Sequence, residues 1–132
     1  MKPKLYVALE GPILLPGTPD SGFKPAVASY AKSFLHWAKD RFNVVILTDS
    51  ALREGLRVIS EMGLALPVRG YVDSKTEALD PQEHYFWVDA ELIPSEVAFL
   101  AQHGHHPRFL QVDSTKGVTP EIKTKLEGYI RK

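Results

Sequence analysis

Apolar residues along this chain follow two spacings, one typical of buried strands and one typical of amphipathic helices. Four short runs are almost continuously apolar, as expected for strands buried on both faces of a sheet: 5–9, 44–47, 85–88 and 109–112. Stretches with apolar residues three and four apart predict helices beginning near Ala26, Ser50, Pro94 and Thr119. This alternation predicts an α/β protein, a three-layer sandwich with a central parallel sheet.

The helical spacing also predicts which side chains face the core. In the first helix the buried stripe comprises Val27, Tyr30, Ala31, Phe34, Leu35 and Ala38. In the second helix, which Ser50 is suited to cap, the stripe comprises Leu52, Leu56, Ile59 and Met62, and Gly63 follows the end. The third helix is expected to run from Pro94 to about Gln102. The last buries Ile122, Leu126, Tyr129 and Ile130.

Two stretches between these elements have distinct turn chemistry. Residues 11–25 contain four prolines and three glycines, which predicts an irregular excursion and excludes a regular helix. Ser74-Lys75-Thr76-Glu77 has the spacing of a capping box, in which the first and fourth side chains satisfy the free amides of a helix start. A short helix is therefore expected to begin at residue 75.

Composition narrows the class of protein without identifying it. The chain has 132 residues, 44% of them hydrophobic, which suits a single globular domain over 1–132. Sixteen basic residues balance sixteen acidic ones, which argues against a strongly basic nucleic-acid binder but leaves room for a local basic patch. The absence of cysteine excludes disulfides and thiol nucleophiles. No apolar stretch approaches the roughly 20 residues of a membrane span, and a cytoplasmic protein is expected.

Polar residues gather where three of the predicted strands end. The ends are Ala8-Leu9-Glu10, Thr48-Asp49-Ser50 and Asp89-Ala90-Glu91. Ligands of parallel α/β sheets bind beyond the carboxyl ends of the strands, so these groups are expected to meet at one mouth. The alternative is that they are turn formers facing water, and the pattern alone does not choose between the two.

The order of these residues resembles the haloacid dehalogenase (HAD) superfamily of phosphohydrolases. Its members have Asp-x-Asp-Gly after the first strand, then a strand ending in Thr or Ser, a Lys, and a strand ending in one or two Asp. The counterparts here are Ala8-Leu9-Glu10-Gly11, Thr48, Lys75 and Asp89-Ala90-Glu91. The chain is most similar to the HAD domain of Swiss-army-knife RNA repair proteins, over essentially its whole length. The motifs that carry this likeness are Glu10-Gly11-Pro12-Ile13-Leu14, Trp87-Val88-Asp89-Ala90-Glu91 and Gly117-Val118-Thr119.

The resemblance implies a capless HAD-like, Rossmannoid fold with a degenerate catalytic site. Ala8 stands at the nucleophile position, where a methyl group cannot form the aspartyl-phosphate. Glu10 stands at the acid/base position, and Ala90 removes the second late acid. Thr48 and Lys75 would contact phosphate. Magnesium would be held by Asp89 and by Glu10 through its carbonyl, a set weakened by the loss of a carboxylate at position 8.

The expected function is thus a HAD-like protein without phosphatase activity, a pseudoenzyme that retains weak binding of a phosphate-bearing ligand or a partner. Nucleic acid as partner is implied by the resemblance alone. A second hypothesis is a working Mg²⁺-dependent phosphohydrolase that has recruited Glu10 or Asp89. A third is a homodimeric interaction module using Leu14-Leu15-Pro16 or Leu64-Ala65-Leu66-Pro67. The alternatives without a functional role are a solvated surface Lys75, a Thr48 bonded to its own backbone, and Asp89 as a cap or turn residue.

A histidine cluster lies outside these motifs. His103, His105 and His106 stand close enough together to suggest a zinc or nickel site. No second group of histidines or cysteines has matching spacing, so an exposed loop between helix and strand is the preferred interpretation. Trp37 and Trp87 stand beside apolar runs and are expected to pack in the core.

Overall fold

The computed structural model describes residues 2–22, 24–48, 52–80, 84–102 and 107–130. Five strands form one parallel sheet with the order β5-β4-β1-β6-β7. The bounds are Lys4–Ala8 for β1, Asn43–Thr48 for β4, Val68–Gly70 for β5, Tyr85–Asp89 for β6 and Pro107–Gln111 for β7. The first strand in the chain therefore occupies the centre of the sheet, and its neighbours β4 and β6 end beside it.

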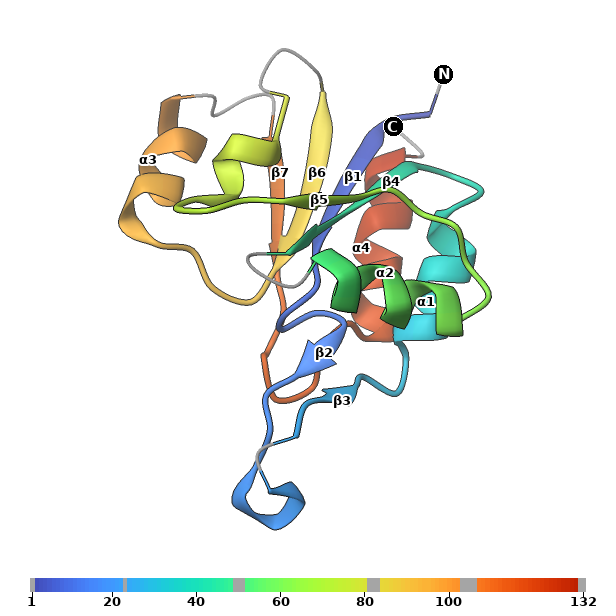
Figure 1. Cartoon of the computed structure of the whole chain (residues 1–132). Helices are drawn as coiled ribbons and strands as arrows, with labels where there is room; N and C mark the ends of the chain where they lie inside the picture. The colour runs from blue at the N-terminus through green and yellow to red at the C-terminus, as the bar shows by residue number, and fades with distance from the viewer. Residues whose placement is uncertain (1, 23, 49–51, 81–83, 103–106, 131–132) are drawn as a thin grey trace.

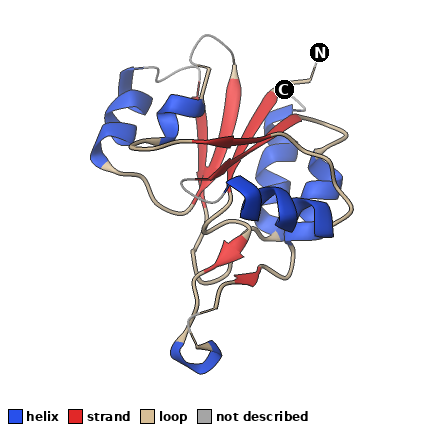
Figure 2. Cartoon of the chain, viewed as in Figure 1, coloured by secondary structure: helices blue, strands red, loops and turns tan. Residues whose placement is uncertain are grey.

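Helices flank the sheet on both sides (Figures 1 and 2). On one side lie α1, α2 and α4, with the bounds Ala31–Ala38, Leu52–Glu61 and Pro120–Ile130. On the other lie α3 and the 3₁₀ helix η2, with the bounds Pro94–Gln102 and Lys75–Ala78. The predicted α/β class and central parallel sheet are confirmed.

Each face of the sheet has its own hydrophobic core, because successive side chains of a strand point to opposite faces. The core under α1, α2 and α4 is the larger, and its bulkiest members include Leu5, Val7, Phe34, Phe42, Ile46, Phe86 and Leu126. The core under α3 and η2 comprises Tyr6, Val45, Leu47, Ala78, Leu79, Tyr85 and Trp87. Burial of each large side chain contributes about 1.5–3 kcal/mol to the free energy of folding, so the two cores are its main favourable source.

The excursion predicted for residues 11–25 is confirmed and contains a small ladder of its own. Strands β2 (Leu14–Leu15) and β3 (Ala26–Val27) pair antiparallel below the main sheet, and the 3₁₀ turn η1 (Pro19–Ser21) lies at the far end of the excursion (Figure 1). Its base is held by the segment before α4, where Val118 N–H donates to the Pro12 carbonyl over 2.9 Å. Gly117 permits this approach: at its φ of +72°, an added Cβ would lie 2.6 Å from that carbonyl oxygen.

The predictions about the buried faces of α1 and α2 are wrong at Val27 and Leu56. The first helix begins at Ala31 and not near Ala26, because residues 26–27 pair with β2 and leave Val27 47% exposed. In α2, Leu56 is 49% exposed although its spacing places it in the buried stripe, while Ile59 and Met62 are buried as predicted. In both cases the local period was correct for a helix, but distant neighbours determined which positions are covered.

The remaining elements agree with the sequence pattern in part. Helix α3 has the predicted bounds, and Ser74 and Glu77 form the predicted capping box. Strand β5 was not predicted, because Val-Arg-Gly is too short and too polar to give a strand signal. In α4 the buried residues are Ile122 and Leu126, whereas Tyr129 and Ile130 are partly exposed, contrary to expectation.

Some predictions fall outside the described residues. The histidines at 103, 105 and 106 lie there, as do Asp49 and Ser50. Within the described part of the chain, no helix is long and apolar enough to cross a bilayer.

Candidate functional site

The carboxyl ends of the three central strands meet at one edge of the sheet. Strands β1, β4 and β6 end at Ala8, Thr48 and Asp89. Val7 pairs with Val88, so Ala8 and Asp89 occupy the next positions of adjacent strands. Ala8 is 1% exposed and presents a methyl group at the centre of this edge.

Thr48 and Glu10 form one polar pair at this edge. The Thr48 hydroxyl donates to Oε1 of Glu10 over 3.2 Å, so this buried hydroxyl has a partner other than its own backbone. Thr48 shares the face of Val44 and Ile46, because strand side chains alternate. That is the α2 side of the sheet, where a Cβ added at Gly55 would lie 3.6 Å from Thr48 Cγ2.

Lys75 and Asp89 form a second pair on the other face. Lys75 Nζ lies 3.0 Å from Oδ2 of Asp89 and also donates to the Glu91 carbonyl over 3.1 Å. The capping box of η2 sets the position of Lys75, which is the first residue of that helix. Its side chain is only 14% exposed, so Lys75 is not a solvated surface lysine. No hydrogen bond or ion pair joins Lys75 to Thr48 among the described residues.

Glu96 completes the second pair, and the sequence pattern did not single it out. Its carboxylate lies 3.4 Å from Lys75 Nζ and accepts from the Lys75 backbone N–H over 2.8 Å. It also accepts from Ser74 Oγ and from the Ile93 N–H, at 3.3 and 3.1 Å. Although Glu96 lies in the first turn of α3, where an acid is a common cap, it is buried. The sequence shows an acid in the first turn of a helix, but nothing local indicates that this acid is buried. Its burial depends on contacts with η2, 21 residues earlier at Lys75.

The environment of Asp89 is strongly desolvated. Oδ1 accepts from the N–H groups of Ala90 and Glu91 at 2.7 and 3.4 Å. Oδ2 forms an ion pair with Lys75 Nζ at 3.0 Å, and no other described group donates to it. Burial raises the pKa of the Asp89 carboxyl, and the nearby Lys75 charge opposes that rise without cancelling it. Two buried acids thus share one ammonium group.

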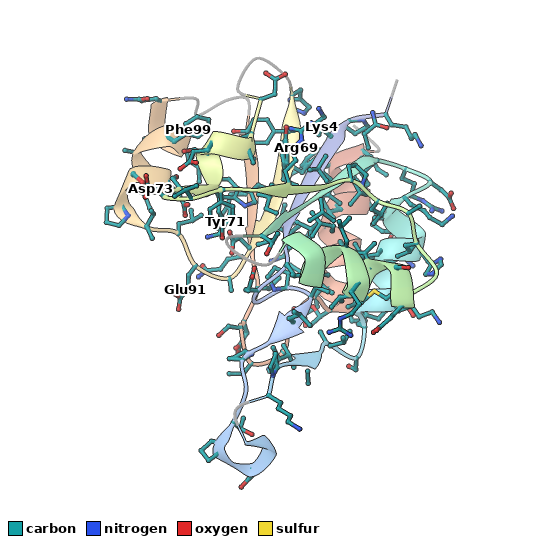
Figure 3. The ribbon with its side chains drawn as sticks, viewed as in Figure 1. Lys4, Arg69, Tyr71, Asp73, Glu91 and Phe99 are labelled. Atoms are coloured by element: carbon teal, nitrogen blue, oxygen red, sulfur yellow. The ribbon has the colours of Figure 1, made fainter. Side chains whose placement is uncertain are left out.

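A cleft of about 700 Å³ opens beside this cluster. Its polar lining residues are Glu10, Lys75, Asp89, Glu91 and Ser114. Its other lining residues are Leu9, Gly11, Leu14, Leu15, Pro16, Pro25, Tyr71 and Ala90. Tyr71 and Glu91 are among the side chains labelled in Figure 3. The excursion therefore provides one wall of the cleft, and the strand ends and the segment around η2 provide the rest.

The described residues do not fit a resident magnesium ion. Ala8 has no side-chain donor, and the oxygens of Asp89 are already approached by Lys75 and two backbone amides. Nowhere in the described part of the chain do three or more His, Cys, Asp or Glu side chains gather as metal ligands would. Mg²⁺ requires several hard oxygen donors, and a neighbouring ammonium group repels it.

Comparison of the chain with family models, with curated proteins and with solved structures finds no significant match. The fold defines an α/β protein with a five-stranded parallel sheet flanked by helices. The site is a cleft at the carboxyl edge of that sheet, with two polar pairs on opposite faces of it.

Proposed function

We propose that this chain is a HAD-like domain without phosphatase activity that serves as a binding module through the cleft at the strand ends. One observation supports the proposal: the central strand ends at the buried residue Ala8, which the family resemblance aligns with the carboxylate nucleophile of the covalent mechanism. Removing the nucleophile from a covalent mechanism costs on the order of 10⁶ in turnover.

The neighbouring carboxylates are poor substitutes for the missing nucleophile. Glu10 accepts a hydrogen bond from Thr48, which orients it toward the α2 side of the sheet. Asp89 is buried, and its oxygens are already engaged by Lys75 and by two backbone N–H groups. A phosphohydrolase that has recruited Glu10 or Asp89 remains the rival hypothesis.

The phosphatase test compares the natural chain with single and double variants in one assay. Release of phosphate from p-nitrophenyl phosphate with Mg²⁺ is expected to be at background for the natural chain and for Glu10→Gln. Restoring both acids in Ala8→Asp/Glu10→Asp is expected to give measurable turnover. The control is Ala65→Asp, which makes the same change at an exposed alanine in a loop. Turnover by the natural chain that is abolished by Glu10→Gln or Asp89→Asn would favour the rival and exclude the proposal.

Phosphate binding by this cleft has limited electrostatic support. Lys75 was predicted to contact phosphate, yet its ammonium group already lies between Asp89 and Glu96. An additional anion would therefore meet little uncompensated charge on Lys75. A phosphate-bearing or nucleic-acid ligand therefore stays a prediction from the family resemblance.

One of the two segments suggested for a homodimer interface, Leu64-Ala65-Leu66-Pro67, packs partly within the molecule. Leu64 is buried and Leu66 packs against the larger core, so this segment is used within the molecule. Leu14 and Leu15 are partly buried and line the cleft, so the first patch belongs to the candidate binding site. Sedimentation of a monomer at high protein concentration would count against a dimer through this patch.

A further inference from the structure

We propose that the cleft binds a small, uncharged and largely apolar molecule, one with an aromatic or alkyl body and at most a hydroxyl group. This inference rests on the proposed binding function of the cleft and specifies the class of its ligand. Two features of the lining carry it. The side chains that the excursion contributes are apolar, and the polar groups at the strand ends already have partners within the chain.

The excursion provides the apolar wall of the cleft. Leu14, Leu15, Pro16 and Pro25 line the cleft on this side. Leu14 and Leu15 pack against the larger core but are only partly buried, so part of their apolar surface is left at the cleft. Pro16 and Pro25 have no backbone N–H to donate to a polar ligand. Removal of such a surface from water is the favourable free energy that an apolar ligand gains.

The turn after β1 has already used the backbone groups that a polar ligand would need. Gly11 N–H donates to the Leu14 carbonyl over 2.8 Å, and Leu14 N–H donates to the Leu9 carbonyl over 2.8 Å. Gly11, Leu14 and Leu9 all line the cleft. A ligand that entered here would replace water without gaining a backbone donor from Gly11 or Leu14.

The turn after β6 is satisfied in the same way. The N–H groups of Ala90 and Glu91 donate to Oδ1 of Asp89, at 2.7 and 3.4 Å. The Ala90 carbonyl accepts from Nε2 of Gln111 over 3.1 Å, and the Glu91 carbonyl accepts from Lys75 Nζ over 3.1 Å. Both lining turns therefore direct their hydrogen bonds into the protein and not toward the cleft.

The buried charges at the cleft are paired with each other. Lys75 Nζ lies 3.0 Å from Oδ2 of Asp89 and 3.4 Å from Oε1 of Glu96. A charged ligand would lose its hydration in the cleft without meeting an unpaired charge in this cluster. Glu10 and Glu91 are exposed at the mouth, where water screens their carboxylates and an ion pair contributes little. The cleft thus selects against charge of either sign.

The size of the cleft and its satisfied backbone favour a small molecule over a peptide. Its volume of about 700 Å³ lies within the range of about 300–1,000 Å³ that is typical of small-molecule sites. A peptide brings a donor and an acceptor with nearly every residue, and burying them without partners is unfavourable. Tyr71 adds an aromatic ring to the lining, which suits packing against an apolar or aromatic body.

The test is an NMR titration of the ¹⁵N-labelled full chain with three probes that share one body. At pH 7, 4-phenylbutan-1-ol is uncharged, 4-phenylbutanoate is an anion and 4-phenylbutylamine is a cation. The alcohol is expected to shift the amides of Gly11, Leu15, Tyr71 and Ala90. It is expected to bind about tenfold more tightly than either charged probe, because burial of an unpaired charge is unfavourable. Phenyl phosphate and the peptide acetyl-Gly-Leu-Phe-Leu-Gly-amide are further probes, both expected to bind more weakly than the alcohol.

Two exposed prolines of the excursion provide a matched pair of variants. Pro16 lines the cleft, whereas Pro19 lies in η1 at the far end of the excursion (Figure 1). Pro16→Asp places a carboxylate at the apolar wall and is expected to weaken binding of the alcohol about threefold to tenfold. Pro19→Asp is expected to leave binding unchanged. Because both prolines are exposed, neither substitution disturbs a core.

A second pair tests the apolar contact itself. Leu15→Ala removes apolar surface from the cleft and is expected to weaken binding of the alcohol about threefold. Val27→Ala is the control, because Val27 lies in the paired strand β3, is 47% exposed and is outside the cleft lining.

The contrary outcomes are distinct. No amide shifts with the alcohol, equal or tighter binding of a charged probe or of phenyl phosphate, or equal effects of Pro16→Asp and Pro19→Asp would overturn the inference. Tighter binding of the peptide would exclude a small-molecule ligand. Tight binding of a charged probe without phosphatase turnover would leave the proposed function standing, whereas turnover of p-nitrophenyl phosphate by the natural chain would refute that function separately.

Discussion

Lys75 carries its charge between two buried carboxylates, and this arrangement gives a sharp prediction for a single residue. Lys75→Met would leave Asp89 and Glu96 desolvated without a cation. Breaking a buried ion pair by removing one partner costs about 3–5 kcal/mol, and we expect a loss of that size in the free energy of unfolding at pH 7. Urea denaturation followed by circular dichroism measures it.

The control is Lys39→Met, which removes an exposed lysine whose 3.1 Å pair with Asp40 faces water. Such pairs contribute about 0–1 kcal/mol, so a loss as large as that of Lys75→Met would contradict the interpretation.

The pH dependence of the free energy of unfolding is a second check. Burial raises the pKa of Asp89 in the folded state, so folding favours its protonated form and its contribution to stability falls as pH rises through that pKa. Without Lys75 the pKa rises further, and the deficit of Lys75→Met is expected to be larger at pH 8 than at pH 5.

Gly11 is the residue at which backbone conformation and packing combine. Its φ is +107°, and an added Cβ would lie 2.7 Å from Cβ of Ala90. Gly11→Ala is expected to lower the free energy of unfolding by about 1–3 kcal/mol for the backbone alone, with a further loss for the collision. Gly63→Ala is the matched control, since Gly63 has a φ of +75° but open space around it.

The double substitution Gly11→Ala/Ala90→Gly separates the two effects. It removes the colliding methyl group and should recover part of the loss, while the backbone cost remains. Equal urea midpoints for the single and the double variant would show that the contact with Ala90 contributes nothing. This contact also gives residue 90 a packing role at the strand ends, besides its place in the motif.

At the scale of the elements, two helical glycines test how far local preference decides stability. Gly128 lies in α4 with open space around it, so Gly128→Ala is expected to raise the free energy of unfolding by about 0.5–1 kcal/mol. In α2 the same change at Gly55 would place a Cβ 3.3 Å from Val68 Cγ1. Gly55→Ala is therefore expected to gain less than Gly128→Ala or to be destabilising, and thermal unfolding of the two variants compares them. Equal gains at both positions would show that helix propensity outweighs packing.

Helix α3 is positioned by contacts with distant residues and not by an apolar stripe of its own. Its charged residue, Glu96, is buried, whereas Val97 is 53% exposed. The helix is anchored through polar contacts to η2, and Phe99 and Leu100 pack against the smaller core. An amphipathic stripe is therefore not what orients this helix.

For the whole molecule, the two cores are expected to unfold together because every central strand contributes to both. Trp87 belongs to the core under α3, and Trp37 packs against the core under α1 and α4. The variants Trp37→Phe and Trp87→Phe each leave one tryptophan as a fluorescence reporter for one side of the sheet. In urea, each variant's fluorescence midpoint is expected to coincide with its own circular dichroism midpoint. Fluorescence that changes well before the loss of secondary structure in either variant would indicate that one layer unfolds independently.

Much of the architecture could be predicted from the chain alone, since the signals are local. The apolar runs at 44–47 and 85–88 and the capping box at Ser74 depend on residues adjacent in sequence, and all three predictions are confirmed. That the strand ends meet at one edge was one of two interpretations of the sequence, and the parallel sheet brings Ala8, Thr48 and Asp89 to that edge.

The features that were mispredicted or missed depend on contacts between distant residues. The pairing of β3 with β2 shortens the first helix, although its spacing continues back to Val27. The burial of Glu96 follows from its position against Lys75 in η2, and the cleft exists because the excursion lies beside the strand ends. A residue's own neighbours set its preferred conformation, but the free energy of burial and of ion pairing depends on which remote groups the folded chain brings to it.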